Sequence, residues 1–279
     1  MSLKNITKTS LAALTAGMLT GVAAQTSDAA TLAGLVDGKS ILWIDSEQKK
    51  VTGMVALDGG ASLVGMDVRP SDGKLYGVTP DGVIVTVDAK TGKWEKKSQL
   101  SEKLPLGAMV SVDFNPVADR MRVITSTGMS LRVNVDDGKA TVDGSLKYAD
   151  SDVNKGKPPN VTAAAYTNSF AGTKETALYD IDVSTGMLLK QAPPNDGIVS
   201  GVGKLGVALD GPIAFDIATD GKGGNVGWLL AAGNLHSVDL ATGAAKSMGA
   251  IVGLKGKVSD IAILPAMRRL LLQGMPCGR

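Results

Sequence analysis

One stretch of sequence decides the fold: Val64-Gly-Met-Asp-Val-Arg-Pro70, then Lys74-Leu-Tyr-Gly-Val78, then Val83-Ile-Val-Thr-Val-Asp88, then Lys93-Trp-Glu95. Each piece alternates apolar and polar residues or is a short run rich in β-formers, and turn residues such as Gly separate the pieces. The stretch therefore predicts four short antiparallel β-strands.

The same order of segments recurs along the chain. Further copies open at Val110, Thr162 and Ile213, a period of about 40–50 residues that is typical of β-propeller blades. The outer hairpin of each copy is predicted to close by a turn that runs from Asp or Asn to Gly. Asp and Asn cap such turns with their side chains, and Gly adopts the positive φ that the bend requires. The four predicted turns span residues 88–92, 134–138, 182–186 and 239–243.

The two chain ends together supply one further blade. Strand-like segments at 35–45 and 51–55 lack an opening strand, whereas 258–265 is an opening strand with nothing after it. Joining them closes the ring and leaves no exposed sheet edge on either side. We therefore predict an all-β fold, a β-propeller of about five four-stranded blades in which the C-terminal strand joins the N-terminal blade.

The start of the chain predicts export. Lys4 and Lys8 precede an apolar run from Leu11 to Val22 and then small residues, the pattern of a secretory signal peptide. The run is too short for a comfortable membrane span, so we expect a periplasmic or secreted protein with no span after cleavage. The predicted divisions are a signal peptide at 1–24, a linker at 25–31, the propeller at 32–267 and a disordered tail at 268–279.

Charge and cysteine content restrict the function further. Five of the 29 basic residues lie in the leader and the tail, so 24 basic residues face 27 acidic ones in the body. Nucleic-acid binding needs a basic surface that releases counterions, so it is excluded as a function. Cys277, the only cysteine, lies in the tail, and an intramolecular disulfide is impossible.

Four carboxylates recur at matching positions of the predicted opening strands, which line the central channel of a propeller. Such a ring could hold Ca²⁺ or supply an acid and a base. A residue that recurs in register also suits a structural bond to the backbone of the next blade. The residues are Asp67, Asp113, Asp216 and Asp260.

A loop ahead of the third full copy offers another candidate metal site. Asp150, Asp152 and Asn154 alternate as the ligands of a Ca²⁺ loop do. However, Gly156 comes one position late, and Val161 stands where the closing Glu would be. A capped polar loop is the alternative interpretation. Ca²⁺ is the one cofactor that the sequence suggests.

Other polar residues occur in one copy but not in the rest, which suits a ligand site. Arginines among them could clamp a carboxylate or phosphate, or could pair with Asp between blades. His236 is the only histidine, which excludes a multi-His metal site, and no Gly-x-Ser-x-Gly motif accompanies it. The candidate ligand-binding residues are Asn115, Arg120, Arg122, Tyr166, Asn168, Asn195 and Asp196.

Several motifs together resemble an exported bacterial family catalogued as domain of unknown function 4394. They are Gly65-Met-Asp-Val-Arg-Pro70, Asp113-Phe-Asn-Pro-Val-Ala-Asp-Arg-Met-Arg-Val123, Ala165-Tyr-Thr-Asn-Ser169 and Gln191-Ala-Pro-Pro-Asn-Asp-Gly197. The likeness covers about 32–267, and the Arg-Arg-Leu-Leu-Leu tail departs from it. The resemblance implies a propeller-like repeat fold and brings no established activity or catalytic residue.

Three classes of function remain open. The scaffold is complete while no full catalytic set is visible, which favours a non-enzymatic module that binds a small polar ligand, a glycan or an envelope protein. A glycosidase-like hydrolase is the first alternative, and its inverting form needs two channel carboxyls roughly 6.5–9.5 Å apart. An extracellular matrix or surface scaffold is the second alternative.

Overall fold

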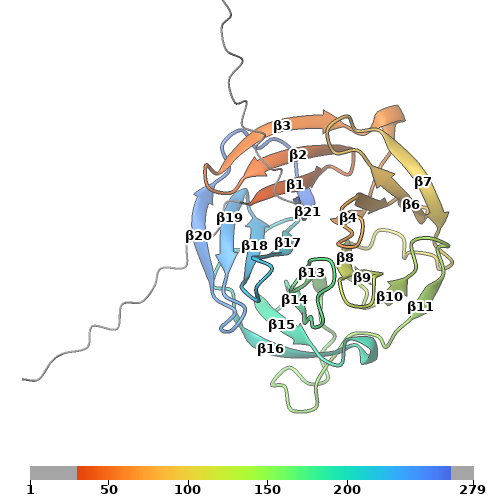
Figure 1. The fold of residues 1–279 in the computed structure, drawn as a ribbon. Helices are drawn as coiled ribbons and strands as arrows, with labels where there is room; N and C mark the ends of the chain where they lie inside the picture. Colours follow the sequence, from red (N-terminus) through yellow and green to blue (C-terminus); the bar gives the residue numbers. More distant parts are fainter. Residues whose placement is uncertain (1–29, 265–279) are drawn as a thin grey trace, which may run out of the picture.

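The computed structural model describes residues 30–264 as a ring of five β-sheets around a central axis (Figure 1). The five-bladed all-β propeller predicted from the repeats is thus confirmed. The predicted signal peptide at 1–24 and tail at 268–279 lie outside the described residues. Within the described part, no helix has the length and apolar character needed to cross a membrane.

Each blade runs from an inner strand at the axis to an outer strand at the rim. Blade 1 contains β21 (Val258–Leu264), β1 (Thr31–Val36), β2 (Ser40–Asp45) and β3 (Lys50–Ala56). Blade 2 contains β4 (Gly65–Val68), β5 (Leu75–Val78), β6 (Val83–Val87) and β7 (Trp94–Gln99). Blade 3 contains β8 (Val110–Asn115), β9 (Arg120–Thr125), β10 (Ser130–Val133) and β11 (Ala140–Val142).

Blades 4 and 5 complete the ring. Blade 4 contains β13 (Val161–Tyr166), β14 (Leu178–Asp182), β15 (Met187–Gln191) and β16 (Ile198–Lys204). It carries a fifth strand, β12 (Lys147–Tyr148), which pairs parallel to β16 at the rim. Blade 5 contains β17 (Ala214–Thr219), β18 (Asn225–Ala231), β19 (Asn234–Val238) and β20 (Ala245–Ala250). Two short 3₁₀ turns, η1 (Asp58–Gly60) and η2 (Pro194–Asp196), are the helical elements of the described part.

The two ends of the described chain meet in blade 1, as predicted. β21 pairs antiparallel with β1, from Thr31 opposite Leu264 to Val36 opposite Val258. Because β21 comes last in the chain and β1 first, their hydrogen bonds close the ring. β21 takes the innermost place in the sheet, so that β1 is paired on both sides.

The hydrophobic core lies between blades, in layers shared by neighbours. Phe114 of blade 3 and Tyr76 of blade 2 meet edge to face, with ring centroids 5.4 Å apart. Inner strands are buried on both faces, as in β13, whereas β7 at the rim is mostly exposed. Each blade therefore depends on both neighbours for its stability.

Four turns close as the sequence predicts, but one occupies a different hairpin. In each, the Gly N–H donates to the carbonyl of the Asp or Asn that opens the turn, and that residue's side chain caps the turn. At Gly138 a Cβ atom would lie 1.9 Å from the Gln99 carbonyl oxygen of blade 2, and φ is +77°, so only glycine fits. The turn at 182–186 joins β14 to β15, the middle hairpin of blade 4. The prediction of an outer hairpin there was wrong, because blade 4 places its fourth strand after residue 197.

Candidate functional site

Three carboxylates converge at the axis from the inner strands of blades 2, 3 and 5. One oxygen of each accepts a hydrogen bond from the backbone N–H of a neighbouring blade. Asp67 accepts from Phe114 at 2.8 Å, Asp113 accepts from Tyr166 at 3.3 Å, and Asp216 accepts from Ile263 at 2.6 Å. These bonds fit the structural role that recurrence in register suggests.

Asp260 does not occupy the matching position in blade 1. It accepts from the N–H of Met66, which precedes Asp67, at 2.9 Å. The bond pattern makes Ala262 the counterpart of the three converging aspartates in blade 1 and Ala165 their counterpart in blade 4. The predicted ring of four equivalent carboxylates is therefore a cluster of three, with Asp260 one layer away. We call Asp67, Asp113 and Asp216 the axial triad.

The axial triad has the geometry of a cation site. One carboxylate oxygen from each residue lies within 4.8 Å of the others, and all three side chains are buried. None of the ion pairs found in residues 30–264 involves them. Three acids thus share a small space without a protein cation to balance them.

Burial and mutual repulsion raise the pKa of these groups. Burial, followed by the Asp216 carboxylate, raises the pKa of Asp67 well above its usual value. The pKa of Asp113 is raised by burial and then by Asp67 and Asp216. Burial raises the pKa of Asp216 to about 6, and burial with the Asp216 charge raises that of Asp260. Without a cation, the cluster therefore retains protons near neutral pH.

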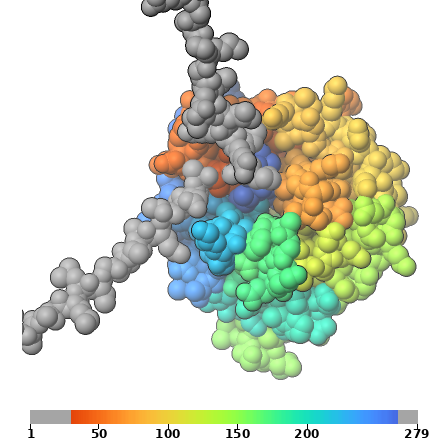
Figure 2. All heavy atoms as spheres, in the orientation of Figure 1, coloured from red at the N-terminus to blue at the C-terminus, as the bar shows by residue number. Residues whose placement is uncertain are grey.

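Two members of the axial triad face a pocket of about 640 Å³. Asp67 and Asp216 belong to its wall, together with apolar residues such as Phe170 and Ile263. No Lys, Arg or His of the described chain lines it. Figure 2 shows this face, on which loops of blades 2, 4 and 5 (orange, green and cyan) gather around the axis. We call this space the axial pocket.

A second polar cluster lies between blades 3 and 4 and unites three of the predicted ligand-binding residues. Arg122, whose side chain is 2% exposed, donates to the Tyr166 hydroxyl at 3.1 Å and to Asn195 Oδ1 at 3.0 Å. It also donates to Asp143 at 2.6 Å, and Arg132 binds the same carboxylate. The guanidinium of Arg122 is thus occupied by the protein itself, as the inter-blade alternative predicted.

Asp180 of β14 is buried, and neither of its carboxylate oxygens has a partner within residues 30–264. Burial raises its pKa to about 8, and the Arg122 charge offsets this only in part. Gln191 Oε1, on the neighbouring strand, also lacks a partner in the described chain. The face of blade 4 toward blade 3 therefore carries polar oxygens that the protein leaves unsatisfied.

Among the other predicted ligand residues, Asn115 and Arg120 form hydrogen bonds within their own turn. Asn115 Oδ1 accepts from the N–H groups of Val117 and Ala118. Arg120 is exposed and donates to the carbonyls of the same turn. Asp196 is exposed in η2. Asn115 also lies beside the Tyr166 hydroxyl of the Arg122 cluster, whereas the structure does not bring Arg120 and Asp196 into one site with Arg122.

The predicted calcium loop has protein partners for its oxygens. Asp150 pairs with Lys155 at 2.9 Å, and Asp152 accepts from the N–H groups of Asn154 and Gly201. Asn154 Oδ1 accepts from Lys157 at 3.4 Å. The loop thus holds its shape through internal bonds, as the capped-loop alternative describes.

A family model described as a domain of unknown function, DUF4394, matches residues 42–262. The chain belongs to this family. A search of curated proteins finds no match to it. The family resemblance drawn from the motifs is thus confirmed, and membership brings no activity with it.

Several solved structures are similar to this DUF4394 chain at low sequence identity. A protein of unknown function from Bacteroides thetaiotaomicron is 14% identical, with a TM-score of 0.53 over 84% of this chain and 64% of the other. A calcium-binding protein, regucalcin, from Agrobacterium tumefaciens is 13% identical, with a TM-score of 0.45 over 85% and 78% of the two chains. An auxiliary nutrient-binding protein from Bacteroides ovatus is 16% identical, with a TM-score of 0.43 over 71% and 55%. The DUF4394 chain spans less than two thirds of the two Bacteroides chains, and the likeness shows the fold alone.

Sequence reasoning missed several polar residues of this DUF4394 propeller. Ser111 is two residues before Asp113, and its Oγ accepts from the N–H of Ala164 at 2.9 Å. The alternation of side chains along β8 would have placed Ser111 beside Asp113 on the same face. Asp143 lies outside every repeat, and no pattern in the sequence connects it with Arg122.

Proposed function

We propose that this DUF4394 protein is an exported, non-enzymatic binding protein that takes a cationic ligand, foremost a divalent metal ion, into the axial pocket. The observation that carries the proposal is the convergence of the axial triad beneath a pocket that no Lys, Arg or His among residues 30–264 lines. The pocket volume falls within the range of about 300–1,000 Å³ typical of small-molecule sites. A small polar ligand thus suits the axial pocket better than a glycan chain or an envelope protein.

The spacing of the triad suits Ca²⁺. Calcium binds oxygens at about 2.3–2.6 Å, so two ligands on one ion lie at most about 5 Å apart. The triad oxygens all lie within 4.8 Å of one another, which meets this limit. Each carboxylate also has one oxygen tied to the next blade, which fixes its direction before the ion arrives. Asp67, Asp113 and Asp216 would hold the ion, and its charge would relieve their repulsion.

The same spacing argues against the inverting form of the hydrolase alternative. An inverting glycosidase needs about 6.5–9.5 Å between its carboxyls to admit a water, and the triad oxygens are closer than that. Backbone N–H groups engage one oxygen of Asp67, one of Asp113 and both of Asp216. The triad is therefore better suited to hold an ion than to divide acid and base roles.

The proposal also places the protein outside the cytoplasm. The basic, apolar and small-residue segments of 1–24 are those of a signal peptide, and Ca²⁺ sites of extracellular modules bind at about 10⁻⁴–10⁻³ M. Mass spectrometry of the protein purified from its natural host measures the mature N-terminus. We expect it near Gln25, in the periplasmic or secreted fraction, and an intact Met1 in the cytoplasmic fraction would contradict export.

Calcium titration tests the binding site. Isothermal titration calorimetry of the chelator-treated protein with CaCl₂ should give one site per chain. Asp113→Asn and Asp216→Asn should each weaken binding at least tenfold, because each removes a charged ligand. Asp150→Asn is the matched control, since it removes a carboxylate from the loop at 150–156, and it should bind as the parent does.

Two outcomes would overturn the proposal. If the axial variants bind calcium as tightly as the parent, the triad is not the site. If Asp150→Asn alone abolishes binding, the loop is the metal site instead. Circular dichroism of each variant confirms that the propeller is intact.

A further inference from the structure

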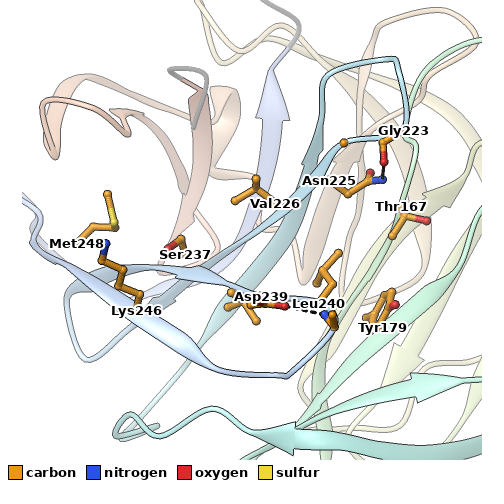
Figure 3. Close-up of a pocket in the computed structure, with 13 residues that line it drawn as sticks. Thr167, Tyr179, Gly223, Asn225, Val226, Ser237, Asp239, Leu240, Lys246 and Met248 are labelled. Atoms are coloured by element: carbon orange, nitrogen blue, oxygen red, sulfur yellow. Dashed lines mark hydrogen bonds between the residues drawn. The ribbon is translucent and has the colours of Figure 1, made fainter. Parts of the chain in front are cut away.

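A second pocket, of about 750 Å³, lies at the end of blade 5 and reaches Thr167 and Tyr179 of blade 4. It extends from Tyr179 on β14, past the ends of β18 and β19, to Lys246 on β20 (Figure 3). It includes Gly223 and Gly224 of the loop before β18, whereas the axial pocket includes Asp220 and Gly221 of the same loop. The two pockets thus lie on either side of one loop. We call the second one the blade 4–5 groove.

A reciprocal pair of asparagines separates the two pockets. The Asn168 backbone N–H donates to Asn225 Oδ1 at 2.8 Å, and Asn225 Nδ2 donates to Asn168 Oδ1 at 2.8 Å. Asn168 also donates to the carbonyl of Glu175. These bonds tie the loop after β13 to the loop before β18. The wall between the two pockets is therefore held in place by hydrogen bonds, and Asn168 positions the loop before β18.

The groove presents polar groups that the described protein does not use. The Tyr179 hydroxyl, Ser237 Oγ and Lys246 Nζ line the groove, and none of the side-chain hydrogen bonds or ion pairs found in residues 30–264 involves them. Asp239 caps its own turn through Oδ1, to Ala241 and Thr242, which leaves Oδ2 available. Figure 3 shows these side chains arranged along the groove.

The composition of the groove points to an uncharged ligand. Asp239 and Lys246 are its only charged residues in the described chain, and they balance each other. Its apolar residues come from both faces of blade 5: Val238 and Leu240 pack toward blade 4, and Val226 packs toward blade 1. A half-buried tyrosine offers a ring face to C–H groups and a hydroxyl to polar ones. This combination of a ring, donors and acceptors without net charge matches the chemistry of sugar rings, which carry hydroxyls at the edge and C–H groups on the face.

We infer that the blade 4–5 groove binds an uncharged oligosaccharide, with Tyr179 as the stacking platform and Lys246, Asp239 and Ser237 as hydroxyl partners. The inference does not depend on metal binding at the axis, because the two pockets share no residue. It adds a second ligand class to the same face of the propeller.

A saccharide titration tests the inference on the full mature chain. Maltotriose, cellotriose, xylotriose and N,N′,N″-triacetylchitotriose serve as probes, each measured by calorimetry and by saturation-transfer NMR. At least one should bind, and Tyr179→Ala and Lys246→Ala should each weaken its affinity at least tenfold. Tyr179→Phe should lose severalfold, since it keeps the ring and removes the hydroxyl. Lys190→Ala is the matched control, because Lys190 is exposed and pairs with Tyr179 across β14 and β15 but lies outside the groove.

Three results would overturn the inference. The first is the absence of binding by all four saccharides at millimolar concentration. The second is a bound saccharide whose affinity both alanine variants leave unchanged. The third is saccharide binding that EDTA abolishes, which would place the sugar on a metal at the axis. Saccharide binding that survives EDTA supports the groove even if the axial triad binds no calcium.

Discussion

Asp113 in blade 3 accepts a hydrogen bond from the backbone N–H of Tyr166 in blade 4, at 3.3 Å. Tyr166 in turn accepts from Arg122, the cross-strand neighbour of Asp113. The interface of blades 3 and 4 therefore joins the axial triad to the buried arginine network. Charge at the axis and cohesion between blades depend on the same residues.

Acidity should control the stability of the metal-free protein through the triad. The folded pKa values of Asp67 and Asp113 are raised, and that of Asp216 is about 6. A raised carboxyl pKa gives stability that is fully present below the unfolded pKa of about 4 and is lost as pH rises through the folded pKa. Urea unfolding in EDTA should therefore show a free energy of unfolding that falls from pH 4 to pH 8. Calcium should reverse most of this fall, because binding displaces the protons. An identical pH profile with and without calcium would contradict the linkage.

Asp180 should make a second pH-dependent contribution to the free energy of unfolding, and calcium should not alter it. Burial raises its pKa to about 8, so its contribution to stability is lost as pH rises from about 4 to about 8. Asp180→Asn keeps the shape and removes the charge, and it should raise the free energy of unfolding at pH 8 with little effect at pH 4. Asp196→Asn, at an exposed carboxyl in η2, is the control and should leave the profile unchanged. If Asp180→Asn follows the parent at both pH values, Asp180 does not titrate in the folded range.

The two arginines that bind Asp143 should differ in their effect on stability. The Arg122 side chain is 2% exposed and that of Arg132 is 35% exposed, while Asp143 is buried. Removing the buried partner leaves uncompensated polar groups, so Arg122→Ala should cost about 3–5 kcal/mol of unfolding free energy. Arg132→Ala should cost about 1 kcal/mol or less, because water replaces its contacts. Unfolding in guanidinium chloride measures both losses. Equal losses of unfolding free energy would contradict the prediction that burial makes the Arg122 pair the more important one.

The fold could be predicted because its determinants are local and repeated. Each blade contains its own strand alternation and turn residues, such as Asp88 and Gly92, and both are visible in a short window. The closure of the ring could be predicted by counting the strands of each repeat. The segment at 258–265 is an opening strand without a blade, and the first blade lacks an opening strand. No long-range information was needed for either step.

The site could be predicted only in part, because it depends on register between blades. Asp260, like Asp113, follows a valine and a serine closely in the sequence. In the structure, however, it accepts from the N–H of Met66 and lies outside the axial triad. A register shift in the β1–β21 pairing between Leu35 and Val36 accompanies this offset. The partners of Arg122 come from residues 130 to 195, which no single repeat contains. The blade 4–5 groove was missed for the same reason, since Tyr179 and Lys246 belong to different blades.

The pairing of β21 with β1 should be essential for stability, because it closes the ring of blades. A chain that ends at Lys257 loses β21 and leaves β1 unpaired along Thr31–Val36. It also loses the axial contacts of Asp216 with Ile263 and of Asp260 with Met66. We expect this truncation to abolish cooperative unfolding and to aggregate through the open edge. A chain that ends at Leu264 is the matched control and should unfold as the full chain does.

A circular permutant separates closure from mere chain length. Thr31 and Leu264 are paired at the same end of β1 and β21, so a two-residue Asn-Gly turn can join them as a hairpin. New ends fit in the loop between β7 and β8, where Leu106 is fully exposed. The permutant should fold with a Tm at least equal to that of the parent, because the strand that closes the ring becomes a local hairpin. A permutant that fails to fold, while the chain ending at Lys257 folds cooperatively, would show that β21 does not hold the ring closed.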